Sequence, residues 1–331
     1  MTGLIAVESK VITKAPLDYD SLFVKWIKFA QVKPASVVGY TKGVKNFFSF
    51  AKANGISDIT RDVLLSYREY LRPITAEERK QGVKGVVGVR ADFKAATANL
   101  YLTATKLFTT FLYQKGIISV NVSERIKNFK VSEQHAKDPL APDTVKKILA
   151  SIDTKTLSGK RDVALFATMC VCGLRCCEIS RANIGDVVER GTKKFLYVQG
   201  KGRDTKEECV ELPQGVCKLI RSYLNERGVV TKAAPLFAST SHRNSEDRIT
   251  TNSISRLVKS ILRANGLDSD RLTAHSLRHT AATTMITNGV ELRRVQEVLR
   301  HKSVVVTERY LADIDRYNNG GECVAAEKFG L

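Results

Sequence analysis

The segment that most narrows the fold of this chain lies near its C-terminus and contains HSLRHT (residues 275–280) and RHKSVVVTERY (residues 300–310). Only five histidines occur among the 331 residues, and three of them fall here, at positions 275, 279 and 301. His275 and Arg278 are three residues apart on an expected helix, so they share one of its faces. Imidazole and guanidinium groups are therefore gathered just ahead of a single phenol, that of Tyr310.

These groups suit the cleavage of a phosphodiester by a tyrosine nucleophile without a metal. Forming the Tyr310 phenolate at pH 7 costs roughly 4 kcal/mol, because tyrosine has a pKa of about 10, and a base or nearby cations reduce that cost. The attacked phosphate gains charge on its non-bridging oxygens, which favours fixed donors aimed at them. The planar fork of arginine meets this need, and two arginines stand out: Arg278 and the Arg175 of CGLRCCEI (residues 172–179).

The charge balance points to a polyanionic partner. Lys and Arg number 53 against 34 Asp and Glu, which gives a net charge of +19 and a pI of about 9.7. Residues 1–130 carry 21 basic and 10 acidic groups and the remainder carries 32 and 24, so the excess is spread over both halves. We therefore expect both halves to contact duplex DNA, although a basic protein of another kind would have the same composition.

The first 130 residues are expected to form a small all-helical domain. Apolar residues recur there at helical spacing, and Gly55 and Gly116 follow two of the periodic segments as helix C-caps do. The stretch TAEERKQGVKGVVGVR (residues 75–90) is rich in glycine and charge, and it is expected to be a loop. The expected helices cover residues 18–31, 35–54, 60–71 and 96–115.

A linker and a second, mostly helical domain are expected to follow. Helical periodicity is lost across residues 131–143, where two prolines occur, and the second domain is expected at 144–331. The β-type runs FLYV (195–198) and CVEL (209–212) indicate a hairpin, so the fold class is mainly α with a small antiparallel sheet. Helices are expected near residues 143–152, 160–180, 214–227, 251–265, 276–288, 291–300 and 304–312.

Neither a membrane nor a metal is expected as a partner. No apolar run approaches the roughly 20 residues of a membrane span. Seven cysteines occur, and Cys172 and Cys176 have the i, i+4 spacing of a helix. No second pair of Cys or His follows at zinc-ligand spacing, so the cysteines are interpreted as small core residues in a reducing cytoplasm.

Four motifs occur in one order: a Gly-Leu-Arg box with Arg175 and Glu178, a Gly-Lys-Gly hairpin with Lys201, the HSLRHT box, and His301 followed nine residues later by Tyr310. In this order and spacing the sequence resembles the tyrosine recombinase (phage integrase) family. The resemblance covers about residues 140–315, and the first 130 residues match only in kind, as the helical core-binding domain of such enzymes. It implies a two-domain DNA clamp that cleaves and rejoins duplex DNA through a 3′-phosphotyrosyl intermediate.

The resemblance also implies a role for each site residue. Arg175 and Arg278 would bind the non-bridging oxygens of the scissile phosphate, and His301 would add a hydrogen bond to them. Lys201 would protonate the leaving 5′-oxygen, because an ammonium can give up its proton and a guanidinium cannot. His275 would accept the proton of the attacking phenol.

Some positions admit a second interpretation. Lys206 could replace the lysine of the Gly-Lys-Gly motif, because the sequence does not fix the register of the hairpin. Tyr317 is a competing nucleophile, although it lies outside the spacing that the family implies. Arg300 stands where the family usually has glycine, and it would either add a phosphate contact or simply be exposed. Glu178 and His279 are expected to brace the site rather than to perform chemistry.

Further DNA contacts are expected from two helices of the first domain, in keeping with the family's use of two helices in a groove. Such contacts to phosphates carry much of the affinity without reading sequence. A solvated helix face is the alternative for each candidate. The candidates are Lys42, Lys45, Lys94, Thr97 and Asn99.

The resemblance implies integration or excision of a mobile element in the cytoplasm, by four protomers on two duplexes and without a cofactor. The C-terminal tail, roughly residues 314–331, would dock onto a neighbouring protomer, and accessory DNA-bending or directionality proteins would be further partners. Three alternatives stay open: a chromosome-dimer resolvase of the same family, a type IB topoisomerase, and a DNA-binding relative that has lost catalysis. The complete set of site residues speaks against the last.

Overall fold

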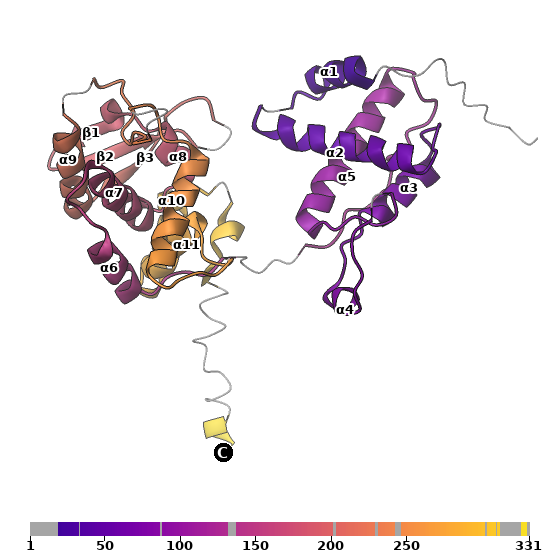
Figure 1. Cartoon of the computed structure of the whole chain (residues 1–331). Helices are drawn as coiled ribbons and strands as arrows, with labels where there is room; N and C mark the ends of the chain where they lie inside the picture. The colour runs from indigo at the N-terminus through magenta and orange to yellow at the C-terminus, as the bar shows by residue number, and fades with distance from the viewer. Residues whose placement is uncertain are drawn as a thin grey trace, which may run out of the picture. The chain divides into compact units, whose positions relative to one another are not determined.

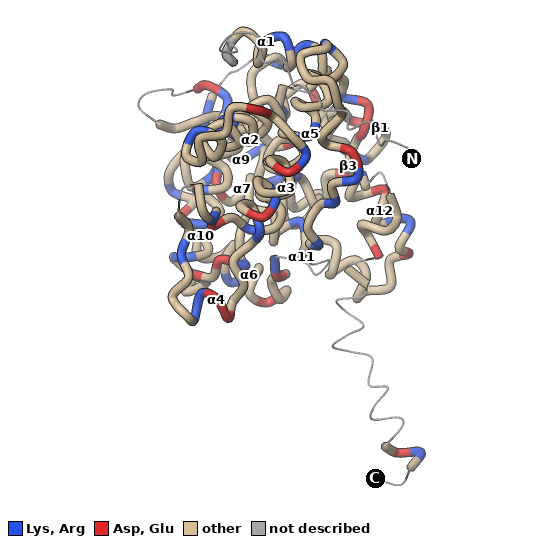
Figure 2. Tube along the Cα trace, turned by 90° about the vertical axis from the view of Figure 1, so that its right-hand side faces the viewer, with Lys and Arg blue, Asp and Glu red and all other residues tan. Residues whose placement is uncertain are grey.

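The computed structural model divides into two compact units, Met1–Glu133 and Gln134–Leu331 (Figure 1). Figure 2 shows Lys and Arg distributed along the traces of both units rather than gathered at one end of the chain. Within the described ranges, no helix has the length and apolar character needed to cross a membrane. The structure describes residues 19–32, 34–86, 88–131, 137–200, 203–228, 231–241, 246–301, 303–308, 310–311 and 326–329.

The first unit is a helical bundle built around aromatic side chains. Trp26, Phe47, Tyr67 and Phe108 are fully buried in its core. The rings of Trp26 and Phe108 meet edge to face with their centroids 5.5 Å apart, an arrangement that aromatic quadrupoles favour. The helices of this unit are α1 (Tyr19–Phe29), α2 (Pro34–Ala53), α3 (Arg61–Tyr70), α4 (Ala76–Lys80) and α5 (Ala95–Gln114).

A glycine explains the close packing of α2 against α5. A Cβ added at Gly43 would lie 2.9 Å from the Cα of Tyr101 and 2.9 Å from the Cβ of Ala104. Glycine destabilises a helix interior by roughly 1 kcal/mol relative to alanine. The close contact between the two backbones, which a Cβ would prevent, offsets this loss of stability.

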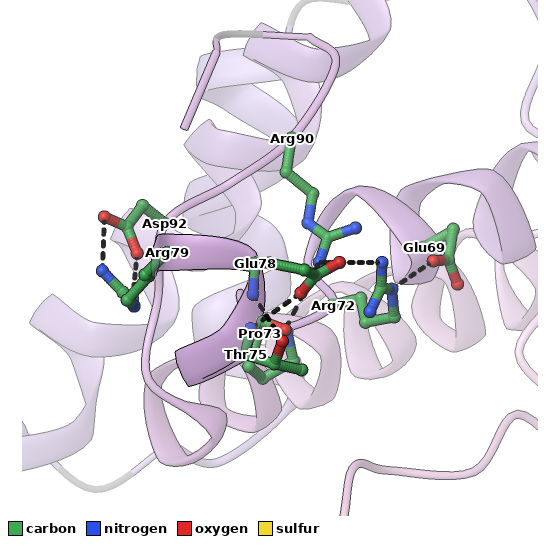
Figure 3. A network of polar contacts seen from close by, with 8 residues as sticks. All are labelled: Glu69, Arg72, Pro73, Thr75, Glu78, Arg79, Arg90 and Asp92. Carbon is green, nitrogen blue, oxygen red and sulfur yellow. Dashed lines mark hydrogen bonds and ion pairs between the residues drawn. The ribbon is translucent and has the colours of Figure 1, made fainter. Parts of the chain in front are cut away.

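The expected loop at residues 75–90 contains a short helix, α4, which the sequence interpretation overlooked. The Thr75 side chain accepts a hydrogen bond from the Glu78 amide at 3.2 Å, and the Glu78 carboxylate accepts one from the Thr75 amide at 2.7 Å. This capping box is legible in the sequence as Thr-x-x-Glu. Figure 3 shows the Glu78 carboxylate reaching also toward Arg72, at 2.9 Å, and Arg90, at 3.2 Å.

Polar contacts rather than an apolar core hold α4. None of its residues is buried, and Figure 1 shows it at the far end of a projection from the bundle. Arg79 pairs with Asp92, and the amide of Val86 donates to the carbonyl of Arg90 at 2.7 Å. The projection is therefore tied together at several points along its length.

The second unit packs helices around a three-stranded antiparallel sheet of order β1-β2-β3, which consists of β1 (Val187–Arg190), β2 (Lys193–Val198) and β3 (Glu208–Leu212). The β2–β3 hairpin was expected, whereas β1 was not, since its four residues end in two charges. Helix α7 packs against α9 and α11. The helices are α6 (Pro142–Ser151), α7 (Leu157–Cys172), α8 (Cys176–Arg181), the 3-10 helix η1 (Ile184–Asp186), α9 (Gln214–Arg227), α10 (Thr251–Ala264), α11 (Ala274–Thr287) and α12 (Leu292–Leu299).

The single helix expected at residues 160–180 is wrong, because the chain breaks there into α7 and α8. Gly173 caps α7 in the left-handed conformation, with φ 61° and ψ 31°. A Cβ at this position would also lie 2.6 Å from Cδ2 of Leu299, so both the conformation and the contact favour glycine. The break removes the helical relation between Cys172 and Cys176, and it places Arg175 at the N-cap of α8.

The last part of the expected linker, residues 131–143, packs with the second unit. Leu140 is buried in the core of that unit, and its amide donates to the hydroxyl of Thr280 at 2.8 Å. Asp138 pairs with Arg271 at 2.6 Å. Residues 132–136 lie outside the described part of the chain.

Candidate active site

Four segments of the second unit bring four of the expected site residues together: Arg175, Arg278, His301 and Tyr310. Arg175 lies at the N-cap of α8, Arg278 lies on α11, and His301 follows α12 directly. Tyr310 belongs to the helical residues 304–308 and 310–311, and it packs in a small apolar cluster with Leu299. The cluster anchors the phenol beside the end of α12.

Arg278 is 1% exposed and ties the ends of two helices together. Its Nη1 donates to the carbonyl of Gly173 at 2.6 Å, and its Nη2 donates to the carbonyl of Leu299. Its Nε is buried and has no hydrogen-bond partner among the described residues. The Nε–H of this guanidinium is therefore available to a group that the described residues do not supply.

Glu178 is the one carboxylate that pairs with the arginines of this pocket among the described residues, and it is fully buried. It accepts from Arg175 Nη1 at 2.7 Å, from the Arg175 amide at 2.9 Å, and from Arg300 Nη2 at 2.8 Å. Burial alone would raise the pKa of Glu178, but the charges of Arg300 and Arg175 and the amide bond outweigh it, so the pKa is lowered. The carboxylate stays ionised and orients both arginines.

Arg300 is buried rather than exposed, so the interpretation of it as an exposed side chain is wrong. It is 8% exposed, and its Nη1 donates to the carbonyl of Val298 at 2.5 Å. Arg175, Arg278 and Arg300 lie near one another, and the single carboxylate of Glu178 pairs with Arg175 and Arg300. The pocket therefore carries an excess of buried positive charge, which an anion would balance.

Tyr310 is packed between two imidazoles and is 1% exposed. Its ring lies parallel to that of His301, with centroids 6.0 Å apart, and at an angle to that of His279, with centroids 4.8 Å apart. His301 Nδ1 lies 2.9 Å from the hydroxyl oxygen of the buried Thr307, which fixes the ring orientation. The phenol and the two imidazoles thus form one packed group.

The protonation states follow from burial among cations. Burial raises the pKa of Tyr310, and the Arg278 and Arg175 charges oppose that rise only in part. Burial, and then the charges of Arg278, Arg175 and Arg300, lower the pKa of His301 to about 3. Burial and neighbouring arginines also lower the pKa of Arg278, to about 9, so it remains cationic. Near pH 7 the phenol is protonated and the His301 imidazole is neutral.

The two histidines of the HSLRHT box have different surroundings. His275 is exposed in the first turn of α11, close enough to His301 to lower the pKa of that residue. His279 is buried, and its Nδ1 lies 2.7 Å from the carbonyl of Lys137. His279 thus joins the start of the second unit to α11 and contacts the phenol, in keeping with a bracing role.

The hairpin lysine is not placed by the structure. Lys201 lies outside the described residues, as does the competing nucleophile Tyr317. The alternative general acid, Lys206, is paired with Asp186. A proton donor held by a carboxylate is less available for a leaving group, so Lys201 is kept in the proposal below.

The DNA-contact candidates of the first unit lie on α2 and α5. Lys42 and Lys45 are exposed on α2, Lys94 is exposed at the N-cap of α5, and Thr97 is half-buried in the first turn of α5. Asn99 differs from them, because its side-chain amide donates to the carbonyl of Phe129 at 2.9 Å and accepts from the amide of Phe129 at 2.8 Å. These two bonds give Asn99 a structural task.

The sequence of this chain matches a known protein family and curated proteins of that family. The model of the phage integrase family matches residues 139–316. The tyrosine recombinase XerC of Pelobacter propionicus is 31% identical over 283 residues, which cover 84% of this chain and 85% of that protein. The tyrosine recombinase XerD of Listeria innocua is 28% identical over 272 residues, which cover 78% of this chain and 87% of that protein.

Solved structures share the fold. The XerH recombinase bound to a palindromic difH substrate, in a post-cleavage complex, has a TM-score of 0.68 at 20% identity and covers 94% of this chain and 86% of its own. A lambda integrase dimer bound to a COC′ core site has a TM-score of 0.61 at 18% identity and covers 87% of this chain and 96% of its own. Because the family model spans more than half of the chain, and the XerC relative is similar over most of it, this chain belongs to the phage integrase family of tyrosine recombinases.

Proposed function

We propose that this protein recombines DNA at specific sites and uses Tyr310 as its nucleophile. The observation that carries the proposal is the cluster of three guanidiniums beside the Tyr310 phenol, where the one carboxylate, Glu178, pairs with Arg175 and Arg300, and Arg278 donates to backbone carbonyls. Two buried donors there, the Nε atoms of Arg278 and Arg300, have no partner among the described residues. A phosphate oxygen would satisfy such donors, and its charge would offset the excess positive charge.

Each residue has a stated role in this proposal. Arg175 and Arg278 bind the non-bridging oxygens of the scissile phosphate, and the neutral imidazole of His301 donates a further hydrogen bond. His275 accepts the proton of the phenol, directly or through water. Lys201 gives a proton to the departing 5′-oxygen.

The reaction is a pair of transesterifications. The Tyr310 oxygen attacks phosphorus, a P–O bond forms to the phenol oxygen, and the bond to the 5′-oxygen breaks with protonation of that oxygen. A 5′-hydroxyl of a partner duplex reverses these steps and expels the phenol. The energy of the broken bond is kept in the phosphotyrosine, so rejoining requires no nucleotide hydrolysis.

Within this chemistry we infer integration or excision of a mobile element, in the cytoplasm, as the biological role. Resolution of chromosome dimers is a second candidate, and the curated relatives named XerC and XerD favour it. The two are separated by deleting the gene. Unresolved chromosome dimers in dividing cells would favour the resolvase, and loss of a circular element detected by PCR would favour the integrase.

The assembly is inferred to be four protomers on two duplexes. A lambda integrase tetramer bound to a Holliday junction is among the structures with the same fold, at a TM-score of 0.62. The tail, roughly residues 314–331, would dock onto a neighbouring protomer, and it lies mostly outside the described residues. Accessory DNA-bending proteins are a further expected partner.

The test traps the covalent intermediate. The full chain is incubated with a pool of nicked duplexes of random sequence, in which the short strand beyond the nick diffuses away after cleavage. Covalent protein–DNA complexes are recovered after denaturation, and sequencing of the trapped DNA gives the site. The expected result is a complex of wild-type protein that Tyr310→Phe does not form.

The control keeps the fold intact. Tyr310→Phe preserves the ring that packs against His301 and His279, so it should melt within a few degrees of the wild-type protein. Trapping that persists in this variant would reject Tyr310 as the nucleophile. A wild-type protein that traps no DNA from the pool would reject the proposed function.

A further inference from the structure

We propose that Arg300 is a third phosphate-binding arginine of this site, which acts beside Arg175 and Arg278 on the scissile phosphate. This inference rests on the proposed function and adds a residue to it. Arg300 is the C-cap of α12, where it adopts the left-handed conformation with φ 55° and ψ 48°. That conformation disfavours residues with a Cβ and favours glycine, so an arginine at this position strains the backbone.

The side chain of Arg300 points into the site rather than into solvent. Its side chain is 2% exposed, and its Nη2 donates to the Glu178 carboxylate at 2.8 Å, the carboxylate that also holds Arg175. The same Nη2 lies 3.5 Å from the carbonyl of Gly173, which Arg278 contacts as well. Arg300 is therefore joined to both expected phosphate ligands through shared acceptors.

One donor of Arg300 is left over. Its Nε is buried and has no hydrogen-bond partner among the described residues, and the same holds for the Nε of Arg278. A buried N–H of a cation is costly when it is unpaired, and an anion with several oxygens can pair with more than one such donor. A cavity of about 490 Å³ is lined by Arg300 and His301 together with residues of β3 and α12.

A purely structural task for Arg300 makes a different prediction. If the residue only positions Arg175 through Glu178, its loss should add nothing to the loss that Arg175→Ala already causes. If it binds the phosphate itself, its loss should add to that of Arg175→Ala and should matter most when the phosphate is charged. Additivity with Arg175→Ala and the charge of the substrate together distinguish the two roles.

The first experiment compares variants of the full chain on a nicked duplex that carries the site recovered from the random pool. Arg300→Gly removes the guanidinium and suits the left-handed backbone, but it also breaks the buried pair with Glu178, so its melting temperature is measured and the rates are compared well below the lower melting temperature. The rate of covalent-complex formation is expected to fall by about 100-fold. Arg300→Lys keeps a charge but loses the planar fork, so a smaller loss is expected.

A matched control lies on the same helix. Arg294 is exposed on α12 and pairs with Glu297 at 3.0 Å. Arg294→Ala removes one positive charge close to Arg300 in the chain, and the rate of covalent-complex formation is expected to stay within about twofold of wild type. Equal losses in Arg294→Ala and Arg300→Gly would assign the effect to overall charge and overturn the proposal.

The second experiment repeats the comparison with a methylphosphonate at the scissile position, where a methyl group replaces one non-bridging oxygen and the linkage is uncharged. The penalty of Arg300→Gly, relative to wild type, is expected to shrink by about tenfold on this substrate. An unchanged penalty, or a penalty that vanishes when Arg300→Gly is added to Arg175→Ala, would overturn the proposal and leave Arg300 as a positioning residue. Wild-type rates in Arg300→Gly would overturn it too, while the proposed function would stand. A wild-type protein that forms no complex with any duplex would reject the proposed function itself.

Discussion

At the scale of single residues, the site depends on one buried carboxylate that serves two guanidiniums. Glu178 forms ion pairs with Arg175, at the start of the same helix, and with Arg300, at the end of α12. Breaking such a buried pair by removing one partner destabilises proteins by roughly 3–5 kcal/mol, because the other charge is left without compensation. Glu178 thus contributes to folding and to the geometry of the site together.

His301 makes the stability of the protein depend on pH. Burial and the arginines hold its pKa at about 3, whereas the unfolded chain has an ordinary histidine value of about 6.5. As the pH falls below about 6.5, His301 binds a proton in the unfolded state but not in the folded state, so the free energy of unfolding decreases. Between pH 7 and pH 5, wild-type protein should lose on the order of 1 kcal/mol more than His301→Gln. Urea unfolding at the two pH values measures this, and parallel losses would contradict it.

Lys201 is expected to supply the proton for the leaving group. Lys201→Ala should slow cleavage of an ordinary nicked duplex, and a 5′-thio leaving group should restore the rate, because a thiolate departs without protonation. Lys206→Ala is the comparison, since that lysine is paired with Asp186. Rescue of Lys206→Ala instead of Lys201→Ala would move the role of general acid to the second lysine.

At the scale of elements, the break between α7 and α8 gives Arg175 its position. Gly173→Ala is expected to lower the free energy of unfolding by about 2–3 kcal/mol, since the new Cβ meets both a left-handed backbone and Leu299 at 2.6 Å. The rate of cleavage should fall as well, because the carbonyl of Gly173 accepts a hydrogen bond from Arg278. Urea unfolding and covalent trapping measure the two effects.

The chain offers a control for this substitution. Gly191 has a similar left-handed conformation, with φ 60°, and a Cβ there would have no atom within 4 Å. Gly191→Ala should therefore show the backbone strain alone, about 1 kcal/mol, and leave cleavage intact. Equal effects at the two glycines would mean that the contact with Leu299 is unimportant.

Local signals predicted most elements but not all of their ends. The hairpin and the helices of the second unit follow from periodicity, and the cap of α4 was legible as Thr-x-x-Glu. The break at Gly173 was missed because the residues around it are apolar and small, so helical periodicity continues through it. Strand β1 was missed because four residues that end in two charges carry little pattern.

At the scale of the whole molecule, the charge of +19 should govern affinity for DNA. Each phosphate contact contributes about −0.9 to the slope of log affinity against log salt concentration. If Lys42 and Lys45 each contact a phosphate, the double variant Lys42→Ala/Lys45→Ala should flatten that slope by about 1.8. Titration of a labelled duplex at several salt concentrations measures the slope. An unchanged slope would place these lysines on a solvated face.

The family and its fold were predictable from the order and spacing of a few motifs. The Gly-Leu-Arg box, the HSLRHT box and the His-to-Tyr spacing predicted a mainly helical recombinase, and the family match over residues 139–316 confirms it. Such motifs can be recognised in a sequence because each catalytic role requires a particular type of side chain at a particular position in the chain. The sequence alone thus determined the fold class and the class of reaction, and it supplied the candidate site residues on which the proposal rests.

Only the tertiary structure decided how those residues meet. Nothing local reveals that Arg300 turns inward to Glu178, that Gly173 offers its carbonyl to Arg278, or that Tyr310 lies between two imidazoles. These contacts join segments far apart in the chain, so they depend on how α7, α11 and α12 pack. The lowered pKa of His301 arises in the same way, since burial and the field of distant arginines exist only after folding.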